Sequence, residues 1–249
     1  MIRKIKRMLI KRKLKLNFKY QYDQLLNLEK QSKKRFILDE RNFFPCLYDN
    51  TPETGFDRHY VYHPAWAARI IKNNNPAKHI DISSTLHFCS ILSAFIPVDF
   101  YDYRPADLHL SDLKSLSGDL MNLPFKSDSI ESISCMHTIE HIGLGRYGDP
   151  LDYDGDIKAI NELKRVLAAN GSLFFVVPLG AKDLICFNAH RIYTKEQVLK
   201  LFSDLELKEF AFIPEEGKDG GLIVDPDQQL LARQFCGCGC FHFIKKISS

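Results

Sequence analysis

Residues 118–178 constrain the fold of this 249-residue chain more than any other stretch. Residues 129–136 (SIESISCM) alternate small or apolar side chains with polar ones, as β-strands do. Residues 157–167 carry apolar side chains at the spacing of an amphipathic helix lying on a sheet, and Asn170-Gly171 is expected to cap the end of this helix. A second strand is expected over residues 173–177. This order of elements indicates one half of an open α/β sheet.

Three ionisable residues, His137, Glu140 and His141, follow the first of these strands directly. Ligands of open α/β sheets bind beyond the carboxyl ends of the strands, so this position favours a functional site. Histidine can accept a proton near neutral pH, and a neighbouring carboxylate can orient its ring. We therefore predict that His137 or His141 is a catalytic base and that Glu140 orients it.

The same stretch resembles the class I S-adenosylmethionine-dependent methyltransferases, in particular their type-11 group. The resemblance covers roughly residues 78 to 246 and preserves the spacing of the family's motifs. A narrower resemblance, in the runs EHIGLGRYGDPLDYDGD and FNAHRIY, is to an uncharacterised, domain-of-unknown-function branch whose members often accompany polysaccharide-synthesis proteins. The matching positions are Asp119, Leu123-Pro124-Phe125, Asp128, Ile130, Ile133, His137, Glu140-His141, Glu162-Leu163, Arg165-Val166-Leu167 and Gly171.

The resemblance implies a Rossmann-like α/β domain with a mostly parallel sheet, a terminal antiparallel hairpin and flanking helices. It implies S-adenosyl-L-methionine as cofactor and methyl transfer to a small or carbohydrate-containing acceptor, with a role in surface polysaccharide synthesis. The alternative from another class is a non-catalytic, methyltransferase-like binding or scaffold protein of a polysaccharide-assembly complex. A calorimetric titration with S-adenosylmethionine would separate the two.

The letters H-x-x-E-H also mark inverted zinc metallopeptidases, in which two histidines one helical turn apart bind zinc. That alternative requires a long helix carrying the motif. Here a predicted strand precedes it and Gly143-Leu144-Gly145 follows it closely. The sequence therefore favours the methyltransferase, and metal analysis of the purified protein would decide between them.

The predicted cofactor residues follow the first three strands. Residues 78–83 should form the first strand, and Ser83 and Ser84 stand where related methyltransferases carry a glycine-rich turn; the scaffold alternative rests on this difference. A second strand is expected over residues 97–103, and its Asp102 lies 21 positions after Asp81, near the ~20-residue offset of a ribose-binding acid. Alternatively, Asp102 only caps the turn before Arg104-Pro105. The resemblance implies that Asp119 meets the adenine amino group and that Leu120 offers a backbone amide. The full set is Asp81, Ser83, Ser84, Asp102, Tyr103, Asp119 and Leu120.

Two polar stretches are expected to bind the acceptor. Residues 143–155 are too polar for a core and too long for a bare connection, and residues 187–191 (FNAHR) follow the next predicted strand. Both reach the same edge of the sheet. The predicted acceptor residues are Arg146, Tyr147, Asp149, Asp152, His190 and Arg191. The alternative is an ordered lid that is held by its own salt bridges.

The amino-terminal residues form a basic arm. Residues 1–19 hold nine Lys and Arg and no acid, which leaves 25 basic and 31 acidic residues elsewhere. As a helix, this arm would place Ile2, Ile5, Met8, Leu9 and Leu16 between basic flanks, which suits an anionic membrane surface. A solvated terminus is the alternative, and nucleic acid is less favoured because no aromatic stacking platform accompanies the charge.

We expect two parts, an extension with linker over residues 1–55 and a methyltransferase domain over residues 56–249. Residues 20–41 are expected to continue as a helix. No apolar run approaches the ~18 residues of a membrane span, and no secretory signal is recognised. The expected location is therefore the cytoplasm, with peripheral contact at the inner face of the membrane.

The seven cysteines are odd in number and scattered, which does not indicate a disulfide framework. Cys236, Cys238, Cys240 and His242 would alternate onto one face of a strand. Same-face neighbours on a strand lie ~6.8 Å apart, too far for the ligands of one tetrahedral metal site. We therefore predict no metal.

Overall fold

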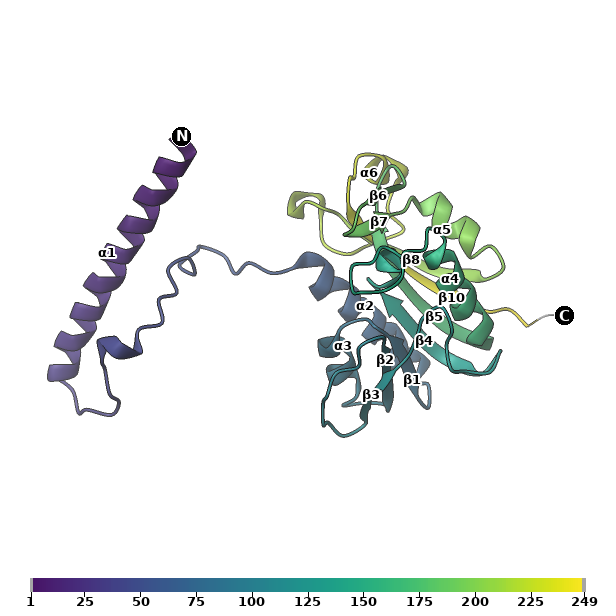
Figure 1. The fold of residues 1–249 in the computed structure, drawn as a ribbon, viewed down its shortest axis with the longest axis horizontal. Helices are drawn as coiled ribbons and strands as arrows, with labels where there is room; N and C mark the ends of the chain where they lie inside the picture. The colour runs from purple at the N-terminus through teal and green to yellow at the C-terminus, as the bar shows by residue number, and fades with distance from the viewer. Residues whose placement is uncertain (1, 248–249) are drawn as a thin grey trace. The chain divides into compact units, whose positions relative to one another are not determined.

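The computed structural model describes residues 2–247 and divides into two compact units, which separate between Phe56 and Asp57. The first unit consists of the helix α1 (Ile2–Lys30) and a short 3₁₀ turn, η1 (Glu40–Asn42) (Figure 1). Phe43 packs edge-on against Phe18 and Tyr22 of α1, with ring centroids 5.0 and 4.7 Å apart. The helix predicted over residues 20–41 is thus too long: amides of Gln31 and Ser32 close 3₁₀-type bonds that end α1.

The second unit is built on an eight-stranded sheet of order β3-β2-β1-β4-β5-β10-β8-β9. Strands β1 to β5 are parallel, and β10 lies antiparallel between β5 and β8. The strands are β1 (His79–Ile82), β2 (Val98–Asp102), β3 (Leu113–Ser117), β4 (Ile130–Met136), β5 (Leu167–Leu179), β8 (Glu206–Ile213), β9 (Ile223–Val224) and β10 (Gly237–Ile244). A separate ribbon pairs β6 (Leu184–Cys186) with β7 (His190–Ile192). The predicted fold class is confirmed.

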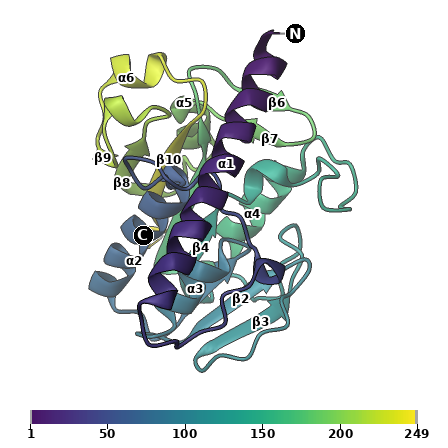
Figure 2. The ribbon, with the colours of Figure 1, turned by 90° about the vertical axis from the view of Figure 1, so that its left-hand side faces the viewer.

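Helices cover both faces of this sheet (Figures 1 and 2). Alternate residues of β5 face opposite sides: Phe175 and Val177 pack with α4 and α5, and Phe174 and Val176 with α2 and α3. The helices of this unit are α2 (Arg58–Asn74), α3 (Leu86–Leu92), α4 (Gly155–Val166), α5 (Lys195–Leu201) and α6 (Gln228–Ala232), with 3₁₀ turns η2 (Ile139–His141) and η3 (Gly217–Asp219). A buried core therefore lies on each side of the sheet.

The predicted helix cap at Asn170-Gly171 is wrong. Helix α4 ends at Val166, and β5 begins at the next residue. The carbonyls of Arg165 and Val166 accept bonds from the amides of Asp128 and Ser129, so the helix end is satisfied before Asn170 is reached.

Within residues 2–247, no helix combines the length and the apolar character needed to cross a membrane.

Candidate functional site

The turn after β1 is sharp although it contains no glycine. Ser83 adopts the left-handed backbone conformation, with φ 54°, which glycine usually supplies. Its N–H and its hydroxyl both donate to the carbonyl of Tyr101, at 2.8 and 3.0 Å, and its own carbonyl accepts from the hydroxyl of Thr138 at 2.9 Å. Hydrogen bonds to two neighbouring segments therefore hold the turn.

Asp81 lies beneath this turn and is fully buried. Its carboxylate accepts from the amide of Ser84 and from the hydroxyl of Ser134, and that hydroxyl lies 2.8 Å from Nε2 of His79. Burial raises the pKa of Asp81 to about 6, although the bonds from Ser134 and Ser84 lower it. The structure thus places Asp81 inside the protein, where it shapes the turn.

The carboxyl ends of β2 and β3 lie beside the carboxyl end of β1 in the sheet. Asp102 Oδ1 accepts from the amide of Arg104 at 2.7 Å, as the turn-cap alternative expects, and Oδ2 takes no bond from residues 2–247. Asp119 is exposed and caps its own turn through the amide of Met121. Tyr103 is exposed, whereas the side chain of Leu120 is buried in the core. Ser83, Asp102 and Asp119 therefore lie at the carboxyl ends of three neighbouring strands, at one edge of the sheet.

His137, Glu140 and His141 form a buried group after β4. Glu140 Oε1 lies 2.9 Å from His137 Nδ1 and 3.9 Å from His141 Nε2, and the side chains are only 1%, 6% and 11% exposed, respectively. His137 has a left-handed backbone, with φ 55°. Glu140 and His141 lie on the single turn η2, His137 precedes this turn, and the carboxylate lies between the two imidazoles. This arrangement does not fit an inverted zinc metallopeptidase, which needs both histidines on one helix.

Helix α2 brings two further histidines to His137. The His59 ring stacks on it at 5.5 Å with an interplanar angle of 4°, and His63 meets it edge-on at 5.1 Å. Burial and the nearby His137 lower the pKa of His59 to about 4 and that of His63 well below its usual value, so both rings are neutral at pH 7. Sequence reasoning missed this pair, which the spacing of the run HYVYH places on one helix face.

Several predicted acceptor residues hold the loop over residues 143–155 together. Asp149 accepts from the amides of Gly143, Gly145 and Tyr147, and Asp152 pairs with Lys158. This is the arrangement expected of an ordered lid.

Arg191, which is buried, fastens the same loop to β7. It donates to the carbonyls of Ile142 and Tyr153 at 2.6 and 3.0 Å, and its Nε lies 3.6 Å from Asp156 Oδ1. We therefore expect Arg191 to affect an acceptor only through the loop.

The two polar stretches meet at His141. Its Nδ1 lies 2.6 Å from the carbonyl of Ala189, which also accepts from Arg146 at 3.0 Å. The Tyr147 ring lies edge-on to His141 and under the guanidinium of Arg146. Arg146 and Tyr147 are exposed and His190 is half-buried. The structure thus brings these residues to one rim.

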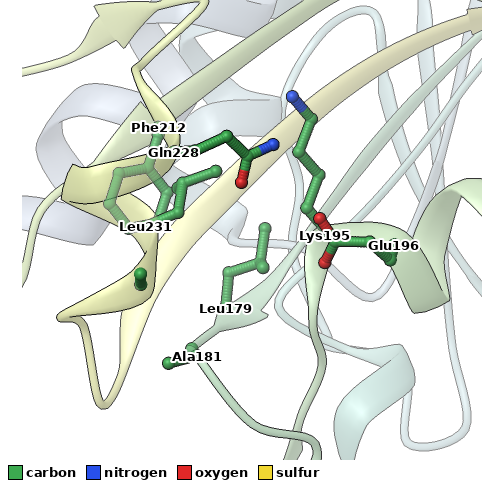
Figure 3. A pocket seen from close by; sticks show the side chains of 9 residues that line it. Leu179, Ala181, Lys195, Glu196, Phe212, Gln228 and Leu231 are labelled. Carbon is green, nitrogen blue, oxygen red and sulfur yellow. The ribbon is translucent and has the colours of Figure 1, made fainter.

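Two cavities lie among the segments that follow β4 and β5. One of about 320 Å³ is lined by residues that include Asp154, Asp183, Arg191 and Gln197. The other, of about 150 Å³, lies between the end of β5 and helices α5 and α6, and Figure 3 shows Lys195 and Glu196 across from Gln228 and Leu231. No predicted site residue lines the second cavity, which is smaller than the ~300 Å³ of a typical ligand pocket.

By sequence, the chain is similar to a family of unknown function and to an uncharacterized protein. Residues 116–215 match a family described as "Caenorhabditis protein of unknown function, DUF268". An uncharacterized protein of Methanocaldococcus jannaschii is 26% identical over 103 residues, which are 40% of this chain and 39% of that protein. The chain thus spans well under half of the curated relative that it matches.

Comparisons with solved structures show the methyltransferase fold. The N-methyltransferase NodS of Bradyrhizobium japonicum, in complex with S-adenosyl-L-homocysteine, has a TM-score of 0.53 at 14% identity, covering 81% of this chain and 91% of NodS. A putative sarcosine dimethylglycine methyltransferase of Galdieria sulphuraria has a TM-score of 0.53 at 13% identity, over 75% and 86% of the two chains. A putative methyltransferase of Bacillus halodurans scores 0.51 at 15% identity, over 74% and 99%.

Proposed function

We propose that this protein is an S-adenosylmethionine-dependent methyltransferase. The observation that carries the proposal is the turn at Ser83, which keeps a left-handed, tightly bonded shape without glycine, at the carboxyl edge of a methyltransferase-fold sheet. Several solved neighbours are described as methyltransferases, and NodS was solved with the product of this cofactor. The shared fold and the shape of this turn together support cofactor binding at this edge of the sheet.

The residues at this edge fit the cofactor. Asp102 would accept from the ribose hydroxyls through Oδ2, which no described residue uses, and Asp119 would accept from the adenine amino group. Ser83 and Ser84 would form the turn beside it, and Tyr103 is exposed nearby. When bound, S-adenosylmethionine supplies an electrophilic methyl group on a sulfonium.

His141 is our candidate for the catalytic base. Its Nδ1 donates to the carbonyl of Ala189, which leaves Nε2 to accept the proton of an acceptor hydroxyl or amine. Burial lowers the pKa of His141, against the effect of Glu140, so the ring is neutral and able to accept a proton at pH 7. Glu140 lies against both imidazoles and would orient them.

The acceptor is proposed to be hydroxylated and carbohydrate-containing, as the narrower resemblance suggests. Arg146, Tyr147 and His190 supply donors and a ring face at the rim, which suits sugar hydroxyls better than a flat apolar molecule. A methyl-transfer screen over glycans, small alcohols, proteins and nucleic acids tests this class. Labelling confined to proteins or nucleic acids would refute it.

Calorimetry with S-adenosylmethionine and S-adenosylhomocysteine tests the function itself. Asp102→Ala should weaken binding about ten- to a hundred-fold, because it removes an acceptor for both ribose hydroxyls. Asp107→Ala, an exposed acid on the same connection, is the matched control and should bind like wild type. Equal binding by Asp102→Ala and wild type would remove Asp102 from the site. If no form binds either compound, the protein is a non-catalytic binding or scaffold protein instead.

A further inference from the structure

We propose that His59, His137 and Cys238 bind a zinc ion. His59 lies in the first turn of α2, His137 follows β4 directly, and Cys238 is the second residue of β10. One ligand atom from each residue lies within 4.8 Å of those of the other two. Tetrahedral zinc ligands are about 3.5 Å apart, so side-chain adjustments of about 1 Å would complete the set.

His137 is already oriented as a ligand. Its Nδ1 lies 2.9 Å from Glu140 Oε1, while Nε2 is buried and has no hydrogen-bond partner among the described residues. A carboxylate that holds one imidazole nitrogen, so that the other faces a metal, is the usual support of a zinc-binding histidine. The side chain is only 6% exposed, so bulk water does not satisfy this nitrogen.

The surrounding side chains belong to the same cluster. The His59 ring is parallel to that of His137, and His63 packs edge-on against His137 from one helical turn further along α2. His63 Nδ1 lies 2.7 Å from the carbonyl of His59, and its Nε2 is a second buried nitrogen without a described partner. A buried imidazole nitrogen without a partner is unusual in a folded protein. The proposed ion would satisfy Nε2 of His137, whereas Nε2 of His63 is not among its ligands.

The donor set selects the metal. Two imidazoles and one thiolate suit zinc, which is a borderline-soft cation, and do not suit magnesium or calcium, which prefer oxygen. Three protein ligands with one open position are also the pattern of catalytic zinc, whereas structural sites have four protein ligands. The role of the ion rests on the proposed function: at the open position it would bind the acceptor's reacting atom and lower its pKa, close to Glu140 and His141.

This site differs from both metal sites that the sequence suggests. The H-x-x-E-H motif would pair His137 with His141, but Glu140 lies between them. A metal site along β10 would combine Cys238 with Cys240 and His242. The His242 ring, however, bonds to the hydroxyl of Ser172. Helix α2 packs on the face of the sheet that also holds Met136 and Cys238, and this packing brings His59, His137 and Cys238 together.

The test is metal binding by the untagged, full-length protein. We expect about one equivalent of zinc by elemental analysis and, on titration of the metal-free protein with Co²⁺, a visible spectrum with a thiolate-to-cobalt band. Cys238→Ser should remove that band and weaken binding at least ~100-fold. His59→Gln should weaken binding similarly but keep the band. Glu140→Gln, which alters the support of His137, should weaken binding about 10- to 100-fold.

Cys240→Ser is the matched control. Its sulfur lies 3.9 Å from that of Cys238 on the same buried face, and its loss should leave the stoichiometry and the spectrum unchanged. Wild-type protein without bound zinc and without a thiolate–cobalt band would overturn the proposal, as would equal effects of Cys238→Ser and Cys240→Ser. If Cys238→Ser fails to fold by circular dichroism, His59→Gln decides, because His59 is only half-buried. Zinc binding without S-adenosylmethionine binding would support this site and refute the methyltransferase.

Discussion

The strained backbone of Ser83 is the most unusual feature of the proposed cofactor turn. Glycine fits φ 54° without cost, whereas a residue with a Cβ atom adopts it at about 1 kcal/mol. Serine offsets this cost because its hydroxyl bonds to the carbonyl of Tyr101. The turn thus needs a glycine-like conformation and not a glycine.

Two substitutions separate the strain from the hydrogen bond. Ser83→Gly and Ser83→Ala both lose the hydroxyl, but only alanine keeps the Cβ atom, so the glycine variant should be more stable by about 1 kcal/mol in urea unfolding. The same pair at Ser84, which has no positive φ, should show the opposite order, because glycine is the more flexible residue in the unfolded chain. A more stable alanine variant at position 83 would contradict the assignment of strain.

The buried carboxyl of Asp81 should make stability depend on pH. Its pKa is raised to about 6 by burial, so the stabilisation of the protonated native form is fully present below the ordinary value near 3.8 and is lost as pH rises through 6. Asp81→Asn cannot ionise. Relative to wild type, its free energy of unfolding should therefore increase by about 3 kcal/mol between about pH 4 and pH 7. Urea unfolding at several pH values measures this difference, and parallel curves for the two proteins would refute it.

Among the elements, the loop over residues 143–155 is held in place by the buried guanidinium of Arg191, which lies on β7. Removing the guanidinium of Arg191 leaves the carbonyls of Ile142 and Tyr153 and the carboxylate of Asp156 without their partner. Arg191→Met should therefore cost about 2–4 kcal/mol and speed amide hydrogen exchange in this loop. Arg146→Met is the control, since this exposed residue should change stability by less than ~0.5 kcal/mol. Equal effects of the two substitutions would show that Arg191 does not fasten the loop.

Helix α1 is proposed to attach the protein to anionic membranes. One side of it carries two exposed apolar and four exposed basic side chains, those of Met8, Lys11, Arg12, Lys15, Leu16 and Lys19. Deleting residues 1–19 should abolish sedimentation with anionic vesicles, and added salt should weaken binding by the intact protein. Replacing Lys11, Lys15 and Lys19 by Gln keeps the helix and should weaken binding on the order of 100-fold. Salt-independent binding, or none by wild type, would favour a solvated terminus.

At the scale of the whole molecule, the division near residue 56 predicts the pattern of limited proteolysis. Residues 31–56 contain only the turn η1 as regular structure and are mostly exposed, and they include Lys33, Lys34 and Arg35. Trypsin should cut there first and leave a resistant fragment that holds the whole sheet, identified by mass spectrometry. Early cleavage within residues 57–244 would contradict two separate units.

The sequence by itself determined those features that depend on residues close together in the chain, namely the individual strands and helices and their order. Alternation over residues 129–136 and helical spacing over residues 157–167 predicted β4 and α4, and the order of elements predicted an open α/β sheet. It also predicted that His137, Glu140 and His141 meet beyond a strand, because residues three and four apart lie within one turn.

Only the tertiary structure decided which polar side chains form hydrogen bonds within the protein and which residues far apart in the sequence meet. Asp81 and Arg191 were predicted to bind ligands, yet their partners, Ser134 and the carbonyl of Ile142, come from other parts of the chain. His59 and Cys238 lie far from His137 in sequence. They converge because α2 packs on the sheet and β10 inserts between β5 and β8. Sequence periodicity gives the direction of a side chain from its own element, whereas its partners depend on long-range packing.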